Sequence, residues 1–338
     1  MRRLAFLAAA VLAVSAAPPA WAEPYDVDLT RLGPPDPTVW TTILNANGGA
    51  FAPTDATPTL YATQSKQRFA ALSSQLALAL SSAVLQTAAT TGYSGFAIDF
   101  EVAYADVKID PIGTSTTVTA LGFTNNAWPT ASSQPSSLVI PGVHVRKALP
   151  YSFEVGGRLL WVNSSNYYAA QGEAKWALNE GFDYVPDIAV RAAFTRLLGV
   201  KDWNLSTTDL DFLVSMRLAA KGVVSFTPYV AARFNLVNYS TERMDFAPCA
   251  VTPPTTPPAP PTCVVATTPD DMRGTTAAFP NFNASFYRTT FGLRFTSYSV
   301  SLAVEGTYFG GATASSIEYP DLKLKSSLSG AAKLGWEF

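Results

Sequence analysis

The last eleven residues, Leu328 to Phe338, read LSGAAKLGWEF, and every second one of them is apolar or small. Side chains alternate between the two faces of a β-strand, so this spacing predicts a strand with two unlike faces. One face holds Leu328, Gly330, Ala332, Leu334, Trp336 and Phe338, and the other holds Ser329, Ala331, Lys333, Gly335 and Glu337. The first face suits lipid and the second a polar interior. A strand of an ordinary soluble sheet is the alternative interpretation.

The same alternation begins at Gly92 and continues to the C-terminus. It predicts ten strands, in the stretches 96–104, 139–145, 153–161, 170–178, 188–194, 210–218, 224–236, 287–295, 300–308 and 328–338. Twelve strands are the alternative, if 115–136 contributes a hairpin.

The links between these strands fall into two groups: those at one end of the strands are short, and those at the other end are mostly long. Counted back from Phe338, the links at the same end of the strands as Phe338 are short turns. The links at the opposite end are long, except for the link at Asn163 to Asn166. The long links are 107–138, 199–206, 238–283 and 309–327. Membrane barrels have short turns on one side and longer loops on the other. We therefore expect an all-β fold, an antiparallel up-and-down transmembrane β-barrel over residues 92–338.

The ending of the chain, with Trp336 two residues before a terminal Phe338, resembles the last strand of bacterial outer-membrane β-barrel proteins. In that family the barrel-assembly machinery reads this pattern as an assembly signal. The resemblance implies a porin-like protein of the cell envelope, in contact with outer-membrane lipid and with both termini in the periplasm. The stretch Gly92 to Phe96 is also similar, over five residues, to the start of the barrel in transporters of the long-chain fatty-acid type.

The N-terminus has the pattern of a secretory signal peptide. Arg2 and Arg3 precede an apolar run, and Ala20-Trp21-Ala22 forms an A-x-A cleavage site, which predicts a signal peptide over 1–22 and a mature chain from Glu23. No later stretch offers about 20 consecutive apolar residues, as a transmembrane helix would need.

Residues 23–91 are expected to form an irregular extension followed by a helix over 64–90. Apolar residues recur there at spacings of three and four, at Phe69, Leu72, Leu76, Leu80 and Val84. A periplasmic helix near the barrel mouth is one interpretation, and a plug that partly fills the lumen is another. Because Leu76, Leu78 and Leu80 also alternate, a strand is a third.

Composition restricts the possible partners and cofactors. Only 14% of residues are charged and the net charge is −2, so nothing marks a nucleic-acid-binding surface. Cys249 and Cys263 flank a Pro-rich stretch in an exported chain, which predicts one disulfide worth about 3 kcal/mol. A metal site would need further ligands, and the chain has one histidine. We expect no cofactor and no metal.

The inward face of the predicted barrel carries acidic and basic residues in equal number. The acidic ones are Asp99, Glu101, Glu154, Glu173, Asp187, Asp209, Asp211, Glu305 and Glu337. The basic ones are Arg146, Arg158, Lys175, Arg191, Arg217, Arg233, Arg288, Arg294 and Lys333. They predict either a network of paired charges that fills a narrow lumen or a constriction that sorts small solutes by size and sign.

Three functions remain open on the sequence. The first is a structural or surface-exposed barrel with at most narrow passive conductance, whose long external loops could meet a partner. The second is a channel or transporter for small or hydrophobic solutes. The third is an outer-membrane lipid-modifying enzyme, for which His144 is the one candidate base. No serine stands in the local pattern of the barrel hydrolases, so catalysis is not the expected function.

Overall fold

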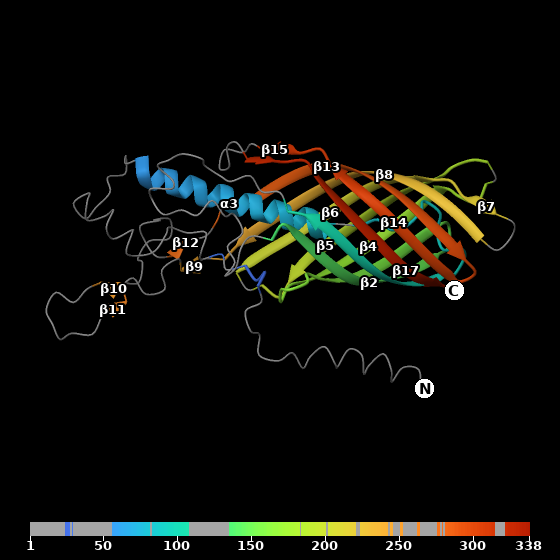
Figure 1. Cartoon of the computed structure of the whole chain (residues 1–338), viewed down its shortest axis with the longest axis horizontal. Coiled ribbons are helices and arrows are strands. Elements are labelled where there is room, and N and C mark those ends of the chain that lie inside the picture. The colour runs from blue at the N-terminus through green and yellow to red at the C-terminus, as the bar shows by residue number, and fades with distance from the viewer. Residues whose placement is uncertain are drawn as a thin grey trace, which may run out of the picture.

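A computed structural model of the chain describes residues 24–27, 29, 56–81, 83–107, 135–182, 184–200, 202–220, 224–242, 244–245, 251–252, 262–263, 276–277, 279, 281–314 and 322–338. Most of them lie in one antiparallel sheet that closes on itself (Figure 1). Its ten wall strands are β1 (Phe96–Asp106), β2 (Ser137–Leu149), β3 (Phe153–Trp161), β4 (Tyr168–Asn179), β5 (Asp187–Leu198), β6 (Trp203–Ser215), β8 (Val224–Thr241), β13 (Phe282–Ser297), β14 (Val300–Phe309) and β17 (Ser327–Glu337).

Each wall strand pairs with the next along the chain, so the barrel is of the up-and-down type. Its seam is the antiparallel pair of β1 and β17, in register from Ala97 opposite Glu337 to Ala105 opposite Ser329. Two further bonds join Phe96 and Phe338 beyond that register, at 2.9 and 2.8 Å. The prediction of ten strands is confirmed, and the alternative of twelve is wrong because β1 pairs directly with β2.

The two ends of the barrel differ as the link lengths predict. At one end, here called the turn end, the links after β2, β4, β6 and β13 are short, and Phe338 lies there. At the other, the loop end, lie three long links: the link after β1 and two that carry the short pairs β9 (Met244–Asp245) with β12 (Thr276–Ala277), β10 (Val251–Thr252) with β11 (Thr262–Cys263), and β15 (Ala312–Ala314) with β16 (Leu322–Leu324). The prediction of a long link over 199–206 is wrong, because β6 begins at Trp203 and leaves only 199–202. A short strand, β7 (Leu218–Ala220), pairs with β8 at the turn end. Cys249 lies outside the described residues, so the disulfide remains a prediction.

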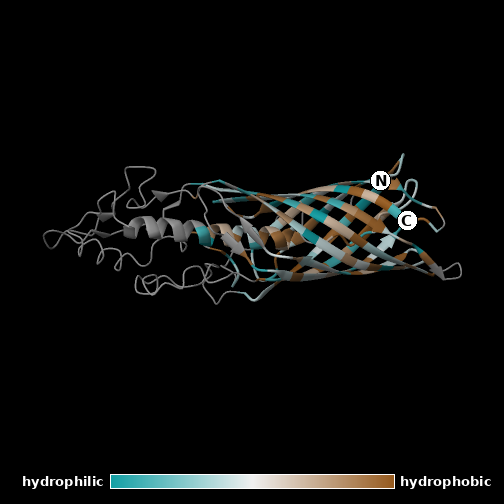
Figure 2. Ribbon diagram, turned by 90° about the horizontal axis from the view of Figure 1, so that it is seen from above, coloured by the Kyte–Doolittle hydropathy of each residue, from teal (hydrophilic) through white to brown (hydrophobic). Residues whose placement is uncertain are grey.

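Many exposed side chains of the wall strands are large and apolar or aromatic. Hydrophobic and hydrophilic residues alternate along these strands (Figure 2). Strands alternate between buried and exposed residues, and the exposed ones include Phe100, Leu159, Phe212, Phe291 and Val304. This is the predicted alternation, with the polar residues turned inward. Among the described residues, no helix is long and apolar enough to cross a membrane.

The helix α3 (Ala56–Leu80) enters the barrel from the loop end (Figure 1). From Phe69 to Leu80 it is buried on every side, as a helix surrounded by a closed wall must be. Phe69 stacks on Phe279 at 4.5 Å and meets Tyr239 edge-on at 5.2 Å. The inner wall is apolar at this level, with residues such as Leu138, Ile140, Leu160, Leu205 and Val237. The loop-end half of the lumen is therefore a packed hydrophobic core.

Two interpretations of residues 64–90 are wrong, and the plug is the one the structure shows. The helix begins at Ala56 and ends at Leu80, whereas residues 81–91 continue through the lumen without helical structure. From Phe69 onward the helix lies inside the barrel and not beside its mouth, and 76–80 is not a strand. Arg288 of the wall donates to the carbonyls of Leu78 and Ser81, and these bonds take the place of those that a further helical turn would make.

Gly292 of β13 provides a test of how tightly the charged half of the lumen is packed. A Cβ built there would lie 2.1 Å from the ring of Tyr229, a buried side chain whose hydroxyl donates to Glu305 at 2.7 Å. Gly292→Ala should therefore destabilise the barrel by about 1–3 kcal/mol, the usual cost of overpacking. Urea unfolding of the refolded protein in lipid vesicles measures it.

Gly306→Ala, on the adjacent strand β14, is the matched control, because nothing lies within 4 Å of a Cβ there. Equal unfolding midpoints for the two variants would show that Tyr229 is free to move.

Candidate functional site

Residues 81–91, here called the lumen segment, run from the end of α3 to the turn end. Ser81 begins it, and its carbonyl accepts from Arg233 at 3.2 Å and from Arg288. Arg288 also donates to the Leu78 carbonyl at 2.9 Å. These carbonyls at the C-terminal end of the helix have no partner within it, and a cation suits that end of the helix dipole. Arg288 and Arg233 thus supply hydrogen-bond donors to the unpaired carbonyls at the C-terminal end of α3.

Charged side chains from opposite sides of the wall hold the middle of the lumen segment. Arg158 donates to the Ala83 carbonyl at 2.7 Å. Glu305 accepts from the backbone N–H groups of Val84 and Leu85, at 2.8 and 2.6 Å. An irregular backbone in a closed space needs such partners, because an unpaired buried N–H or C=O group is costly.

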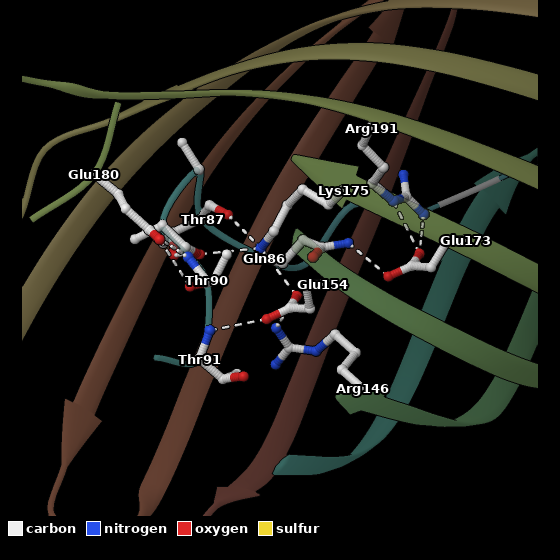
Figure 3. A network of polar contacts seen from close by, with 12 residues as sticks. Gln86, Thr87, Thr90, Thr91, Arg146, Glu154, Glu173, Lys175, Glu180 and Arg191 are labelled. Atoms are coloured by element: carbon white, nitrogen blue, oxygen red, sulfur yellow. Dashed lines mark hydrogen bonds and ion pairs between the residues drawn. The ribbon is translucent and has the colours of Figure 1, made fainter. Parts of the chain in front are cut away.

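Near the turn end, charged side chains of the wall also bind the backbone of the lumen segment (Figure 3). Lys175 donates to the carbonyls of Thr87 and Ala89 at 3.1 and 3.0 Å. Glu154 accepts from the Thr91 N–H at 2.9 Å. Two more bonds in this view join Gln86 to Glu173 at 2.9 Å and the Thr90 N–H to Glu180 at 2.6 Å. The wall therefore binds the lumen segment along its whole length.

The wall charges also pair with one another. Arg191 lies between Glu173, at 2.6 Å, and Asp211. Arg233 reaches the other oxygen of Asp211 at 2.8 Å. A second group lies toward the seam, where Asp99 contacts Arg146 at 2.9 Å and Lys333 at 3.0 Å. All of these side chains are buried. Pairing is what such a site requires, since an unpaired buried charge is strongly destabilising.

His144 is enclosed by charged groups. Its Nδ1 lies 3.0 Å from Glu101 and 3.1 Å from Arg158, and its Nε2 lies 3.0 Å from Glu173. The side chain is 1% exposed. Both ring nitrogens are engaged in the network, so neither faces a space where a substrate could bind. This geometry favours a structural role for His144.

Asp99, Glu101 and His144 are close enough together to offer ligands to one metal ion. The charges around them do not favour one. Asp99 already binds Arg146 and Lys333, and Arg158 contacts Glu101 at 3.0 Å. A divalent cation would lie beside these three cationic side chains and would have to displace them from the carboxylates.

The structure brings most of the predicted lumen residues together in the turn-end half of the barrel. Buried there are Asp99, Glu101, His144, Arg146, Glu154, Arg158, Glu173, Lys175, Asp187, Arg191, Asp209, Asp211, Arg233, Arg288, Glu305 and Lys333. Arg294 and Glu337 form an ion pair at the turn end.

Arg217 is the exception, because it is exposed. β6 ends at Ser215 and does not continue through 218 as the alternation suggested, so Arg217 leaves the inward face. It lines a cavity of about 830 Å³ at the turn end, together with Thr90, Glu180, Arg294 and Glu337.

Residue patterns alone missed the binding of the lumen segment. Ser81, Gln86 and Thr87 belong to a run of small and polar residues that has no period and no motif. Asn235 lies on the inward face of β8, and its bonds to Ser81 at 2.8 Å and Arg288 at 2.7 Å have no signature in the sequence. Trp336 and Phe338, the proposed assembly signal, lie at the turn end, where Trp336 meets Phe100 edge-on.

No protein-family model and no curated protein sequence matches the chain. Solved structures match the chain only at low similarity. Ail, the attachment invasion locus protein of Yersinia pestis, bound to the heparin analogue sucrose octasulfate, is 9% identical over 73% of this chain and 100% of its own, with a TM-score of 0.25. The KdgM porin with disordered oligogalacturonate is 8% identical over 72% and 99%, at 0.29.

Neisserial surface protein A is 10% identical, over 72% of this chain and 97% of its own, with a TM-score of 0.27. Scores at this level support no argument about activity or partner. The barrel described above therefore stands on its own strand pairing.

Arg191→Met should destabilise the protein by about 3–5 kcal/mol, because it leaves Glu173 and Asp211 buried without their shared cation. Arg196→Met is the matched control on the same strand. Its guanidinium is exposed and reaches only Asn204 at 3.3 Å, so a change within about 0.5 kcal/mol is expected. Unfolding in urea measures both variants. Equal effects would argue against a tightly coupled network.

Proposed function

We propose that this protein is a bacterial outer-membrane β-barrel, closed to solutes, that works as an anchor for the parts of the chain exposed at its loop end. The turn end faces the periplasm and the loop end faces outward, as the link lengths favour. The apolar outer wall supports the membrane location, because a continuous apolar surface of this kind is unfavourable in water. Outer-membrane lipid and, through the terminal strand, the barrel-assembly machinery are the partners this implies.

One observation supports the closed state above all: the chain itself occupies the lumen from Phe69 to Thr91, and the cavity of about 830 Å³ lies beyond this blockage, at the turn end. α3 packs the loop-end half, and the lumen segment binds the charged wall of the other half. Phe69, Leu72, Leu76 and Leu80 are each at most 1% exposed. Burial of such a side chain stabilises by roughly 1.5–3 kcal/mol, so spontaneous withdrawal of the helix is strongly unfavourable.

A channel for apolar solutes is the second candidate, and the apolar inner wall of the loop-end half favours it. Opening it would require α3 to leave that wall and the lumen segment to leave Glu305, Arg158 and Lys175. Each of those buried charges would then lose partners, which costs several kcal/mol unless water replaces them. The closed anchor needs no such rearrangement. An enzyme is the least supported of the three functions, because His144 is enclosed.

Single-channel recording in a planar lipid bilayer tests the closed state. The refolded mature protein, residues 23–338, should show no discrete conductance steps. A specific protease site inserted between Gly92 and Tyr93, where Tyr93 is exposed, allows the plug to be cut free after folding. The nicked protein should stay silent until urea extracts the segment before the cut, and should then conduct.

A site inserted between Tyr298 and Ser299, in the turn after β13, is the control, because cleavage there frees no segment. Steps from the intact protein as large as those from the emptied barrel would overturn the closed state. Silence of the emptied barrel, with its fold confirmed by circular dichroism, would reject the channel and leave the anchor.

A further inference from the structure

We propose that the barrel carries its own N-terminal segment across the membrane, so that residues 24–27 and 29 lie on the loop side, opposite the C-terminus. The proposal rests on the proposed function only for the statement that the loop side is the exterior. It goes beyond a plug, because a plug can enter and leave a barrel at the same end. Here the chain passes from one end to the other.

The first described residues bind at the loop end. Asp26 accepts from the backbone and the side chain of Asn166, both at 2.7 Å. The Val27 N–H donates to the Tyr167 hydroxyl at 2.6 Å, and that hydroxyl donates to the Val27 carbonyl at 3.0 Å. The Tyr25 N–H adds a bond to the Ser164 carbonyl at 3.0 Å. These bonds fasten the N-terminal residues to the link between β3 and β4.

That link joins β3 and β4 at the loop end over residues 162–167. Its residues have bonding partners of their own in 24–27, and Leu29 is buried in the apolar cluster that includes Val162 and Tyr167. The N-terminal residues are therefore held at the loop end by both hydrogen bonds and apolar packing.

From the loop end the chain moves steadily toward the turn end (Figure 1). Phe69 lies beside Trp203, at the loop end of β6, with ring centroids 6.1 Å apart. The Ala88 N–H bonds Ser215, at the other end of the same strand, at 3.1 Å. The loop end of β6 therefore contacts α3, and its turn end contacts the lumen segment, so the chain extends at least the length of β6 along the lumen.

The chain reverses direction only after it has reached the turn end. Gly92 takes a φ of +87°, a conformation that glycine adopts without strain, and the Gly95 N–H closes the turn on the Gly92 carbonyl at 2.9 Å. β1 then starts at Phe96 and runs back along the wall. The described residues from Phe69 to Thr91 are thus enclosed by strands that come later in the chain.

The closed wall leaves no sideways path for this segment. β1 and β17 are paired along the seam, so an exit between them would break a ladder of backbone hydrogen bonds in a medium that offers no replacement. The segment therefore reaches the loop side through the lumen, or is enclosed when β17 closes onto β1. In either case the barrel moves part of its own chain from the periplasm to the opposite side.

Labelling with a membrane-impermeant maleimide tests the proposal in cells. Single cysteines are placed at three exposed positions of a full chain that carries Cys249→Ser and Cys263→Ser. Pro24→Cys reports the N-terminal residues, Asn163→Cys the loop end and Tyr298→Cys the turn end. We expect Pro24→Cys and Asn163→Cys to react in intact cells, and Tyr298→Cys to react at least tenfold more after permeabilisation.

The comparison with the two reference positions separates the proposals. If Pro24→Cys follows Tyr298→Cys instead of Asn163→Cys, the passage through the barrel is overturned. If Asn163→Cys is protected while Tyr298→Cys reacts, the orientation in the proposed function fails, yet a protected Pro24→Cys still supports the passage. An epitope tag inserted between Glu23 and Pro24 gives a second readout, by antibody binding to intact cells. Its absence from the surface, with the Asn163→Cys loop labelled, would also overturn the passage.

Discussion

The need to pair every charge that the closed wall shuts away from water governs the interior of this molecule. Closing ten strands into a barrel turns one side of every strand inward, and in the turn-end half that side carries carboxylates, guanidinium groups and ammonium groups. A barrel of this size has little room for solvent once a chain segment occupies it. Each charge must therefore find a protein partner. Arg191, placed between Glu173 and Asp211, shows how the wall meets that demand.

The lumen segment is a product of the same constraint. Its first N–H group, that of Ser81, bonds the Ala77 carbonyl at 2.8 Å, but its other described residues lie in neither helix nor sheet. The wall has hydrogen-bonding capacity left after its ion pairs are made. Glu305 binds two consecutive N–H groups and Arg158 the carbonyl before them. The wall and the lumen segment thus supply each other's hydrogen-bonding partners. This mutual dependence also explains why the helix ends at Leu80, since Arg288 and Arg233 hold the carbonyls that begin the segment.

The two halves of the interior stabilise the chain by different means. The loop-end half uses hydrophobic burial around Phe69, which depends on contact area and tolerates small shifts. The turn-end half uses directional charge-assisted bonds, which lose strength when the atoms move. A helix would slide easily along an apolar wall if nothing else held it. The directional bonds set its depth, and the passage of the chain from one end of the barrel to the other follows from both.

The strand period, the inward charges and the unequal link lengths could all be predicted from the sequence, because alternation along a strand is a local property. The stretch Leu328 to Phe338 already shows this alternation. Arg217 was misplaced because where β6 ends depends on its neighbours, and the helix after Leu80 was extended too far because the partners that end it lie up to 210 residues away. The passage of the N-terminal residues through the lumen has no local signature at all. Only closure of β17 onto β1 encloses the segment and brings Asn166 to Asp26, since long-range pairing decides which end of the barrel each part of the chain reaches.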